Sequence, residues 1–177
     1  MTSTLTAPLQ SRTPSPALDF DALYRAARDD VYAYVATLLR DRVAAEDVTA
    51  AAFERAYRKQ RSYKAARGSE RAWLFGIARN AALDELRRRK RAAALAAEPA
   101  DVDAALPEEA AEAALRRAAV RAALARIGPR ERELIALKFH AGLDNAEIAA
   151  VLGVSVSNAG TQLHRAMTKL REGVEHA

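Results

Sequence analysis

Residues 144–171 read DNAEIAAVLGVSVSNAGTQLHRAMTKLR, and this stretch decides the fold of the second half of the chain. Asp144 and Glu147 stand three residues apart, which is the spacing of a capping box that starts a short helix. Gly153 supplies a turn, and Ser155 is a residue type that caps a following helix. A short helix, a turn with glycine and a longer helix predict a helix-turn-helix, whose second helix enters a groove of DNA.

The second helix of this motif exposes polar side chains that can contact phosphates and base edges, since Asn and Gln pair well with adenine. We expect the DNA duplex to be contacted by Ser155, Ser157, Asn158, Thr161, Gln162, His164 and Arg165. The first half of the helix contains no Lys or Arg, and Gly160 interrupts it. A glycine there costs about 1 kcal/mol relative to alanine, although it lets the backbone approach DNA closely. The isolated helix is therefore predicted to bind DNA weakly.

The helix before this motif starts at a clear signal in the sequence. Gly128 and Pro129 place a glycine past the end of one helix and a proline at the first position of the next. That next helix is predicted to close at Gly142. We assign residues 114–175 to one helical module that contains the helix-turn-helix.

Composition limits the classes of function. The 177 residues are 50% hydrophobic but only 6% aromatic, and the formal charge of +5 with a pI near 9.8 favours a polyanionic partner such as nucleic acid. The absence of cysteine excludes disulfides and cysteine-based zinc sites or catalysis. The three histidines lack metal-ligand spacing, and no phosphate loop or nucleophile motif is present. We expect no catalytic residues, no metal, no cofactor and no enzymatic activity.

No apolar run approaches the ~20 residues of a membrane helix, so we expect no membrane partner and a cytoplasmic protein. Residues 1–18 are rich in Thr, Ser and Pro and are predicted to be a disordered leader. Residues 92–113 carry six acidic side chains and no basic one, which indicates a linker. The predicted fold is all-α, with two small helical domains over 19–91 and 114–175 joined by this flexible linker.

The first module, 19–91, has the pattern of three helices. Apolar residues recur at spacings of three and four from Phe20 to Leu38, which is one face of a helix. Asp41 is predicted to cap a second helix, with Val48, Ala52 and Ala56 inward, and Phe53 and Tyr57 at the edge of the core. Gly68 breaks the following loop, and Ser69 is expected to cap a third helix over 70–91. Trp73 is assigned to the core because Leu74 and Ile77 lie in the same apolar segment.

Three stretches together resemble the small bacterial sigma factors of the extracytoplasmic-function (ECF) group. They are AEDVTAAAFERAYR (45–58), RAWLFGIARNAALDELRRRKR (71–91) and IGPRERELIALKFHAGLDNAEIAAVLGVSVSNAGTQLHRAMTKLR (127–171). The resemblance implies a sigma factor that binds core RNA polymerase and directs transcription initiation at promoter DNA. It implies that sigma region two, 19–91, reads the minus-ten element largely as single strand. Sigma region four, 114–175, would read the minus-thirty-five element as duplex.

The resemblance also implies roles for residues. The surface that contacts polymerase would include Asp47, Phe53, Glu54, Arg55, Tyr57 and Arg58. The melted minus-ten strand would be held by Tyr63, Lys64, Arg67, Arg71, Arg79, Asn80, Arg87 and Arg88. These types suit the task because unpaired bases stack and hydrogen-bond while the backbone is anionic. The alternative for the Arg run at 87–91 is a solvated helix end.

The chain departs from the family's pattern in two places. Ala50, Ala51 and Ala52 replace a polar triplet before Phe53, which affects the expected polymerase contact. Gly160 and Gln162 stand where the family commonly has Lys and Arg, which weakens the expected hold on phosphates. Weak DNA binding by this helix is sufficient for promoter recognition if polymerase holds the helix at the promoter. Linking two binding modules raises the overall affinity by roughly 10²–10⁴.

Other interpretations of the sequence stay open. The helix-turn-helix also resembles stand-alone regulators, which bind palindromic sites as dimers. A degenerate sigma-like interaction protein is a further alternative, favoured by the alanine triplet and Gly160. The acidic linker either threads through a basic polymerase channel or is a plain solvated tether. The resemblance implies an anti-sigma protein as an additional partner.

Overall fold

The computed structural model describes the backbone of residues 18–95 and 111–175, and the side chains of residues 18–94 and 118–175. These residues form seven α-helices and two short 3-10 turns, with no strand among them, as predicted for an all-α fold. The predicted leader up to residue 17 lies outside the described residues. So do residues 96–110, which hold most of the acidic linker.

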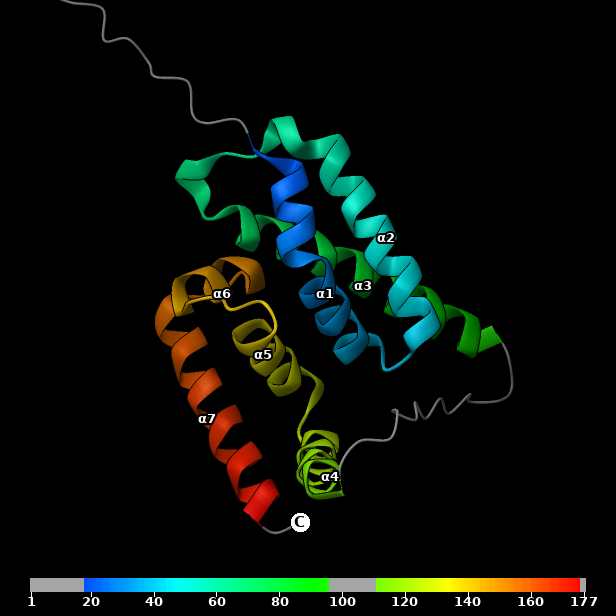
Figure 1. Ribbon diagram of the computed structural model, residues 1–177, viewed down its shortest axis with the longest axis vertical. Helices are drawn as coiled ribbons and strands as arrows, with labels where there is room; N and C mark the ends of the chain where they lie inside the picture. Colours follow the sequence, from blue (N-terminus) through cyan, green and yellow to red (C-terminus); the bar gives the residue numbers. More distant parts are fainter. Residues whose placement is uncertain (1–17, 96–110, 176–177) are drawn as a thin grey trace, which may run out of the picture.

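The first module contains three long helices joined by short connections (Figure 1). They are α1 (Phe20–Leu39), α2 (Arg42–Lys59) and α3 (Glu70–Leu95), with 3-10 turns η1 (Gln60–Ser62) and η2 (Ala65–Arg67) between the last two. The three helices pack against one another. Helix α3 continues four residues beyond the predicted end at Arg91.

The predicted caps start α2 and α3. The Asp41 carboxylate accepts a hydrogen bond from the Ala44 N–H at 3.1 Å, and the Ser69 hydroxyl accepts one from the Ala72 N–H at 3.1 Å. Gly68 precedes Ser69 with a φ of +138°, a conformation that L side chains rarely adopt. Local chemistry therefore determines where both helices begin.

The second module contains four helices. They are α4 (Ala111–Arg126), α5 (Pro129–Phe139), α6 (Asn145–Leu152) and α7 (Val156–Glu175). Helices α4, α5 and α6 all pack against α7, with α4 near the C-terminal end of α7 (Figure 1). Gly173 of α7 lies so close to α4 that an added Cβ would meet the Ala123 Cβ at 3.0 Å.

The helix-turn-helix is confirmed as α6 and α7. The Glu147 N–H donates to Asp144 at 2.8 Å and the Asp144 N–H donates to Glu147 at 3.0 Å, so the predicted capping box forms. Gly153 makes the turn in the left-handed region, with φ +67°. The Ser155 hydroxyl then accepts from the Asn158 N–H at 3.2 Å and caps α7.

The ends of the core follow the prediction and extend it by one residue. Leu38 is half-buried and packs against the core, and Leu39 beside it is buried before Arg40 turns the chain at φ +53°. Tyr57, predicted at the edge of the core, is 59% exposed and packs its ring edge-on against Phe20 with centroids 5.2 Å apart. Phe53, predicted at the same edge, is buried.

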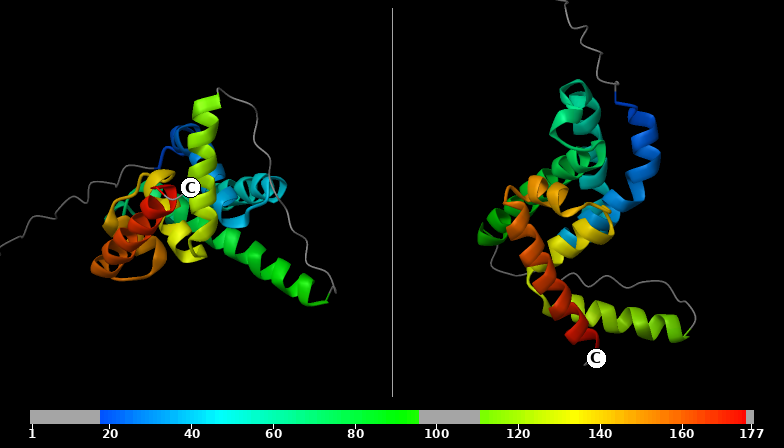
Figure 2. Two further views of the ribbon diagram at one scale, coloured as in Figure 1. Left: turned by 90° about the horizontal axis from the view of Figure 1, so that it is seen from below. Right: turned by 90° about the vertical axis from the view of Figure 1, so that its left-hand side faces the viewer.

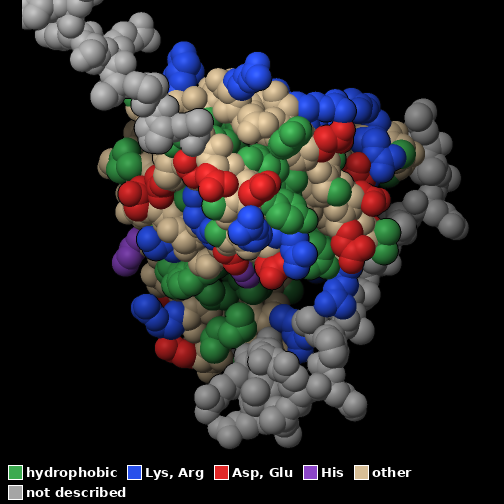
Figure 3. Space-filling view, turned by 45° about the horizontal axis from the view of Figure 1, so that its top comes forward, with side chains coloured by type: hydrophobic (Ala, Val, Ile, Leu, Met, Phe, Trp, Pro, Cys, Tyr) green, Lys and Arg blue, Asp and Glu red, His purple; other side chains and the backbone are tan. Residues whose placement is uncertain are grey.

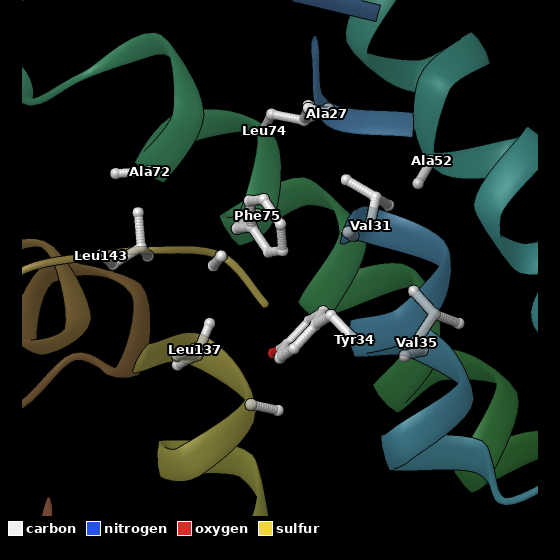
Figure 4. Close-up of a cluster of buried hydrophobic side chains, with 14 of the residues drawn as sticks. Ala27, Val31, Tyr34, Val35, Ala52, Ala72, Leu74, Phe75, Leu137 and Leu143 are labelled. Atoms are coloured by element: carbon white, nitrogen blue, oxygen red, sulfur yellow. The ribbon is translucent and has the colours of Figure 1, made fainter. Parts of the chain in front are cut away.

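The two modules pack directly on each other and share one continuous core. Helix α5 contacts α1, and α6 contacts α3, so that α5 and α6 lie between the first module and α7 (Figures 1 and 2). Tyr34 of α1 and Phe75 of α3 meet edge-to-face at 5.4 Å, beside Leu137 and Leu143 of the second module (Figure 4). No sequence pattern predicted this shared core.

Candidate nucleic-acid interface

The outer face of α7 carries a row of exposed polar side chains. They are Ser157, Asn158, Thr161, His164 and Arg165. Ala159, Leu163 and Ala166, on the opposite face, are buried. The residues predicted to contact duplex DNA therefore lie together, next to the exposed cap Ser155.

Gln162 differs from this row because it lies half-buried on the flank of α7. Its Nε2 donates a hydrogen bond to Oδ1 of Asn158 at 2.7 Å. The two amides thus satisfy one donor and one acceptor between themselves, which leaves the Asn158 amino group and the Gln162 carbonyl to meet a base or phosphate.

A side chain at Gly160 would point toward α6. A Cβ at this position would lie 3.4 Å from Nδ2 of Asn145, the first residue of α6, which is an ordinary contact distance. The packing of α7 on α6 therefore leaves room for a Cβ and does not require glycine here. The missing side chain faces α6 instead of the outer face of the helix.

A groove of about 490 Å³ lies where the loop between α2 and α3 meets α3 and α6. It is lined by Ser62, Tyr63, Lys64, Arg67, Gly68, Ser69, Ala72, Trp73, Gly76, Ile77, Asn80, Ala150 and Val151. Lys64, Arg67 and Asn80 are exposed at this groove. Cations, an amide and aromatic rings therefore surround one recess, as binding of an unpaired base requires.

The aromatic wall of the groove is built by Tyr63 and Trp73. Their ring centroids are 5.7 Å apart with the planes tilted by 59°. The Tyr63 hydroxyl donates to the Gly68 carbonyl at 3.0 Å, which ties the loop together. Burial raises the pKa of Tyr63, so its hydroxyl stays protonated at neutral pH. Trp73 is half-buried and packs against the core, as predicted.

Arg71 and Arg79, which we expected to contact the melted strand, are engaged inside the protein. Arg71 donates to the main-chain carbonyls of Ala141 and His140, pairs with Asp30 and lies over the Phe75 ring. Arg79 donates from Nε to Glu133 at 2.6 Å, and its side chain is only 18% exposed. In this arrangement both cations hold the two modules together.

Acidic neighbours accompany the Arg-rich end of α3. Arg87 pairs with Asp84 at 3.2 Å, Arg88 with Glu85 at 2.8 Å, and Arg89 bridges Glu85 and Asp41 at 2.8 Å each. The bonds from Arg88 and Arg89 lower the pKa of Glu85 to about 2. This end of α3 projects from the body of the molecule (Figure 2). Arg87 and Arg88 are more than two-thirds exposed and remain accessible to phosphate.

The residues expected to contact polymerase lie along α2. Asp47, Glu54, Arg55, Tyr57 and Arg58 are all exposed, with Glu54 paired to Arg58 and Arg55 to Asp84 of α3. The face in Figure 3 mixes carboxylates with Lys and Arg, which lie along its upper edge and are also scattered over its middle and lower part. This face therefore carries both positive and negative side chains and is not uniformly basic.

The alanine triplet of α2 is not all surface. Ala50 is exposed and Ala51 is half-buried, but Ala52 is fully buried. A polar residue at 52 would need a partner in the core. Only the first two alanines can alter a surface that binds another protein.

Two carboxylates that were not predicted from the sequence hold Arg71 and Arg79. Glu133 is 5% exposed within α5, and Asp30 is half-buried on α1. Glu133 directly precedes the apolar run of α5, and Arg79 lies inside the apolar part of α3, where a charge is unusual. Their positions indicate that each charge lies close to the core, but they do not indicate which residue it pairs with.

Neither a membrane nor a metal is suggested by the described part of the chain. None of its helices is both long and apolar enough to cross a bilayer. In residues 18–95 and 111–175, no three His, Asp or Glu side chains come close enough together to hold a metal ion.

Comparison with known proteins accounts for both modules. Residues 23–92 match the Sigma-70 region 2 family, and residues 117–170 match the Sigma-70 region 4 family. The sigma factor SigL of Mycobacterium tuberculosis is 31% identical over 85% of this chain and 88% of its own length. The chain belongs to the ECF RNA polymerase sigma factors.

Other members of this family show different coverage. BldN of Streptomyces coelicolor, also an ECF RNA polymerase sigma factor, is 32% identical over 85% of this chain, which spans 58% of the length of BldN. The solved sigma factor RpoE of Bartonella quintana, in complex with the anti-sigma factor NepR, has the same fold. Its TM-score is 0.76 at 24% identity, covering 89% of this sigma factor and 97% of RpoE.

Proposed function

We propose that this sigma factor brings core RNA polymerase to promoters through three surfaces, formed by α2, by the groove beside α3, and by α7. Sigma factors direct transcription initiation, and the proposal concerns which residues do so. The chain would contribute binding free energy in the cytoplasm, while polymerase supplies the chemistry. The observation that carries the proposal is the groove, where exposed Lys64, Arg67 and Asn80 surround aromatic rings.

The groove would bind the melted minus-ten strand. Asn80 offers both an amide donor and a carbonyl acceptor to a base edge. Lys64 and Arg67 would neutralise phosphates beside it, with Arg87 and Arg88 extending the track along α3. Base reading would thus depend on Asn80, whereas the cations would contribute affinity for any sequence.

Helix α7 would read the minus-thirty-five duplex with few charges. Arg165 is its only exposed cation among the predicted contacts in the described chain, and His164 lies beside it. The other contacts are hydroxyls and amides, which position the helix but contribute less affinity than cations. Tethering to polymerase would compensate, because a linked module binds at high effective concentration.

The deciding experiment measures binding of the purified protein to core RNA polymerase at two salt concentrations. Tight binding, with transcription in vitro from a promoter of its own regulon, supports the proposal. No binding would favour a stand-alone regulator or a degenerate relative, and Ala50 and Ala51 would be the first positions to restore to polar residues.

Replacing Asn80 by Ala tests the groove within the same assay. We expect the variant to bind core polymerase as tightly as the wild type while its preference among promoters changes. Asn158→Ala on α7 serves as the comparison, since it alters the other DNA surface. Equal loss of transcription from every promoter would contradict base reading by Asn80.

We also expect an anti-sigma protein as a partner, because the Bartonella quintana sigma factor was solved in complex with one. A pull-down from the native host with this chain as bait, followed by a transcription assay, would identify it. Recovery of polymerase subunits without any inhibitory protein would count against this partner.

A further inference from the structure

The Arg-rich end of α3 has few contacts with the rest of the first module. Leu86 is the last side chain of α3 that packs against the core, and residues 92–94 are exposed. Arg87 and Arg88 pair with carboxylates of α3 itself. Among the described residues beyond Leu86, Arg89 alone makes an ion pair that leaves the helix. The direction in which this end of α3 projects therefore depends on Arg89.

Two carboxylates share the Arg89 guanidinium. Its Nε donates to Glu85 of α3 and its Nη2 donates to Asp41, each at 2.8 Å. The side chains are 33% exposed for Arg89, 12% for Glu85 and 22% for Asp41, so salt screens these pairs less than fully exposed ones. A planar guanidinium also holds its two acceptors in fixed directions, which a lysine ammonium does not. Arg89 thus forms a rigid link between α3 and the residue before α2.

Asp41 places this link at the junction of α1 and α2. It follows Arg40, whose left-handed backbone ends α1, and its Oδ1 caps α2 by accepting from the Ala44 N–H at 3.1 Å. Its Oδ2 accepts from Arg89, so one carboxylate both starts α2 and holds the end of α3. The bonds from Ala44 and Arg89 outweigh the effect of burial and lower the pKa of Asp41, which stays charged at neutral pH. Because α2 carries the proposed polymerase surface, the end of α3 is aligned directly with that surface.

We propose that Arg89 is a positioning residue, which fixes the direction of the last turns of α3 so that the two arginines before it meet the phosphates of a bound strand. The inference rests on the proposed function of α3, and it gives neighbouring arginines different tasks. Arg87 and Arg88 are more than two-thirds exposed, whereas Arg89 is only one-third exposed and is held by two carboxylates. Arg89 acts on strand binding through Asp41 and does not itself contact a phosphate.

A double-mutant cycle between positions 41 and 89 of the full chain tests this role. Asp41→Asn keeps the cap of α2, because the amide oxygen still accepts from the Ala44 N–H, but its amide nitrogen cannot accept from Arg89. Arg89→Gln removes the cation. Glu46→Gln is the matched control for the loss of one negative charge, since Glu46 is exposed on α2 and has no ion-pair partner among the described residues. Binding of a fluorescent oligo-dT is measured at several salt concentrations.

Each single variant should bind oligo-dT roughly 3-fold more weakly than the wild type, and the double variant no more weakly than either, because all three break the same link. The direction of the Asp41→Asn effect is decisive, since removing a negative charge near a cationic surface would by itself strengthen binding of a polyanion. Glu46→Gln should therefore bind at least as tightly as the wild type. Asp41→Ser replaces Asp41→Asn if that variant fails to fold, because serine is also a good helix cap.

Either of two results would overturn the inference. One is unchanged binding by Asp41→Asn. The other is additivity: Arg89→Gln would lower the affinity equally with and without Asp41, and each time reduce the slope of log affinity against log salt by about 0.7, as a direct phosphate contact does. Replacing both Arg87 and Arg88 by Ala in the same assay distinguishes these results from failure of the proposed function. If that replacement also left binding unchanged, the end of α3 would not bind the strand at all.

Discussion

At the scale of single residues, burial determines which positions matter for stability. Thr49 of α2 is 7% exposed, and its hydroxyl has no hydrogen-bond partner among the described residues. A buried polar group without a partner costs roughly 1–3 kcal/mol. Gly160, in contrast, leaves room for a Cβ, which would lie at ordinary contact distance from Asn145 of α6.

Replacing Thr49 by Val should therefore stabilise the protein. The shape is kept and the unpaired hydroxyl is removed, so we expect the free energy of unfolding to rise by about 1 kcal/mol. Urea denaturation followed by circular dichroism measures it. Thr37→Val is the control, since the Thr37 hydroxyl donates to the Ala33 carbonyl at 2.8 Å and its removal should not stabilise. A loss of stability at position 49 would show that the hydroxyl is satisfied.

Replacing Gly160 by Ala should also stabilise the protein, by about 1 kcal/mol, because glycine is a poor helix former. The new methyl group would lie in ordinary contact with Asn145, away from the outer face of α7. Binding to minus-thirty-five duplex should stay the same. Gly153→Ala should do the reverse, since φ is +67° there. If Gly160→Ala bound the duplex more weakly than the wild type, the backbone at this glycine would have to lie close to DNA.

At the scale of helices, α3 combines two functions along its length. Its first half is buried and carries Arg71 and Arg79, whereas its last turns project into solvent with their arginines paired to carboxylates (Figure 2). Exposed ion pairs are weak, worth about 0–1 kcal/mol each. Arg87 and Arg88 can therefore exchange a carboxylate for a phosphate at little cost, while Arg89 also joins α3 to Asp41 at the start of α2.

Replacing both Arg87 and Arg88 by Ala should reduce the salt dependence of strand binding. Each phosphate contact on single-stranded DNA contributes about 0.7 to the slope of log affinity against log salt, so the slope should fall by about 1.4. Oligo-dT binding by the full chain at several salt concentrations gives this value. The exposed pair Arg25 and Arg28 on α1, replaced likewise, should leave the slope unchanged. If the double variant kept the wild-type slope, Arg87 and Arg88 would be side chains of a solvated helix end that do not contact phosphate.

Replacing Glu85 by Gln should lower stability in a way that depends on pH. The pKa of Glu85 is about 2 in the folded protein and near 4.5 when unperturbed, so its contribution is present above pH 4.5. It disappears as the pH falls toward 2. Because Arg88 is 69% exposed, we expect a loss of about 1–2 kcal/mol at neutral pH.

Denaturation of wild type and Glu85→Gln between about pH 7 and pH 3 tests this expectation. The difference between the two proteins should shrink below pH 4.5. Glu46, exposed on α2 and without an ion-pair partner in the described part of the chain, is the control for replacement by Gln. A difference that stays constant with pH would exclude the arginine pairs as its cause.

At the scale of the whole molecule, local signals predicted the elements but not how the modules pack. Asp41, Ser69 and the Asp144–Glu147 box act within four residues, so the sequence shows them directly. Arg79 and Glu133 are 54 positions apart, and the residues next to each of them in the sequence do not indicate its ion-pair partner. For the same reason Arg71 and Arg79 were assigned to DNA alone, although the structure places them between the modules.

The position of Trp73 has a consequence for how this sigma factor can be followed in solution. It is the only tryptophan, and it lies in the groove against Tyr63, close to where α6 forms the wall. Indole emission changes with the polarity around the ring and is quenched when a base stacks on it. The chain thus carries its own optical reporter. Its emission should change when a strand enters the groove and a base stacks on the aromatic wall, so that strand binding can be followed in one unlabelled sample.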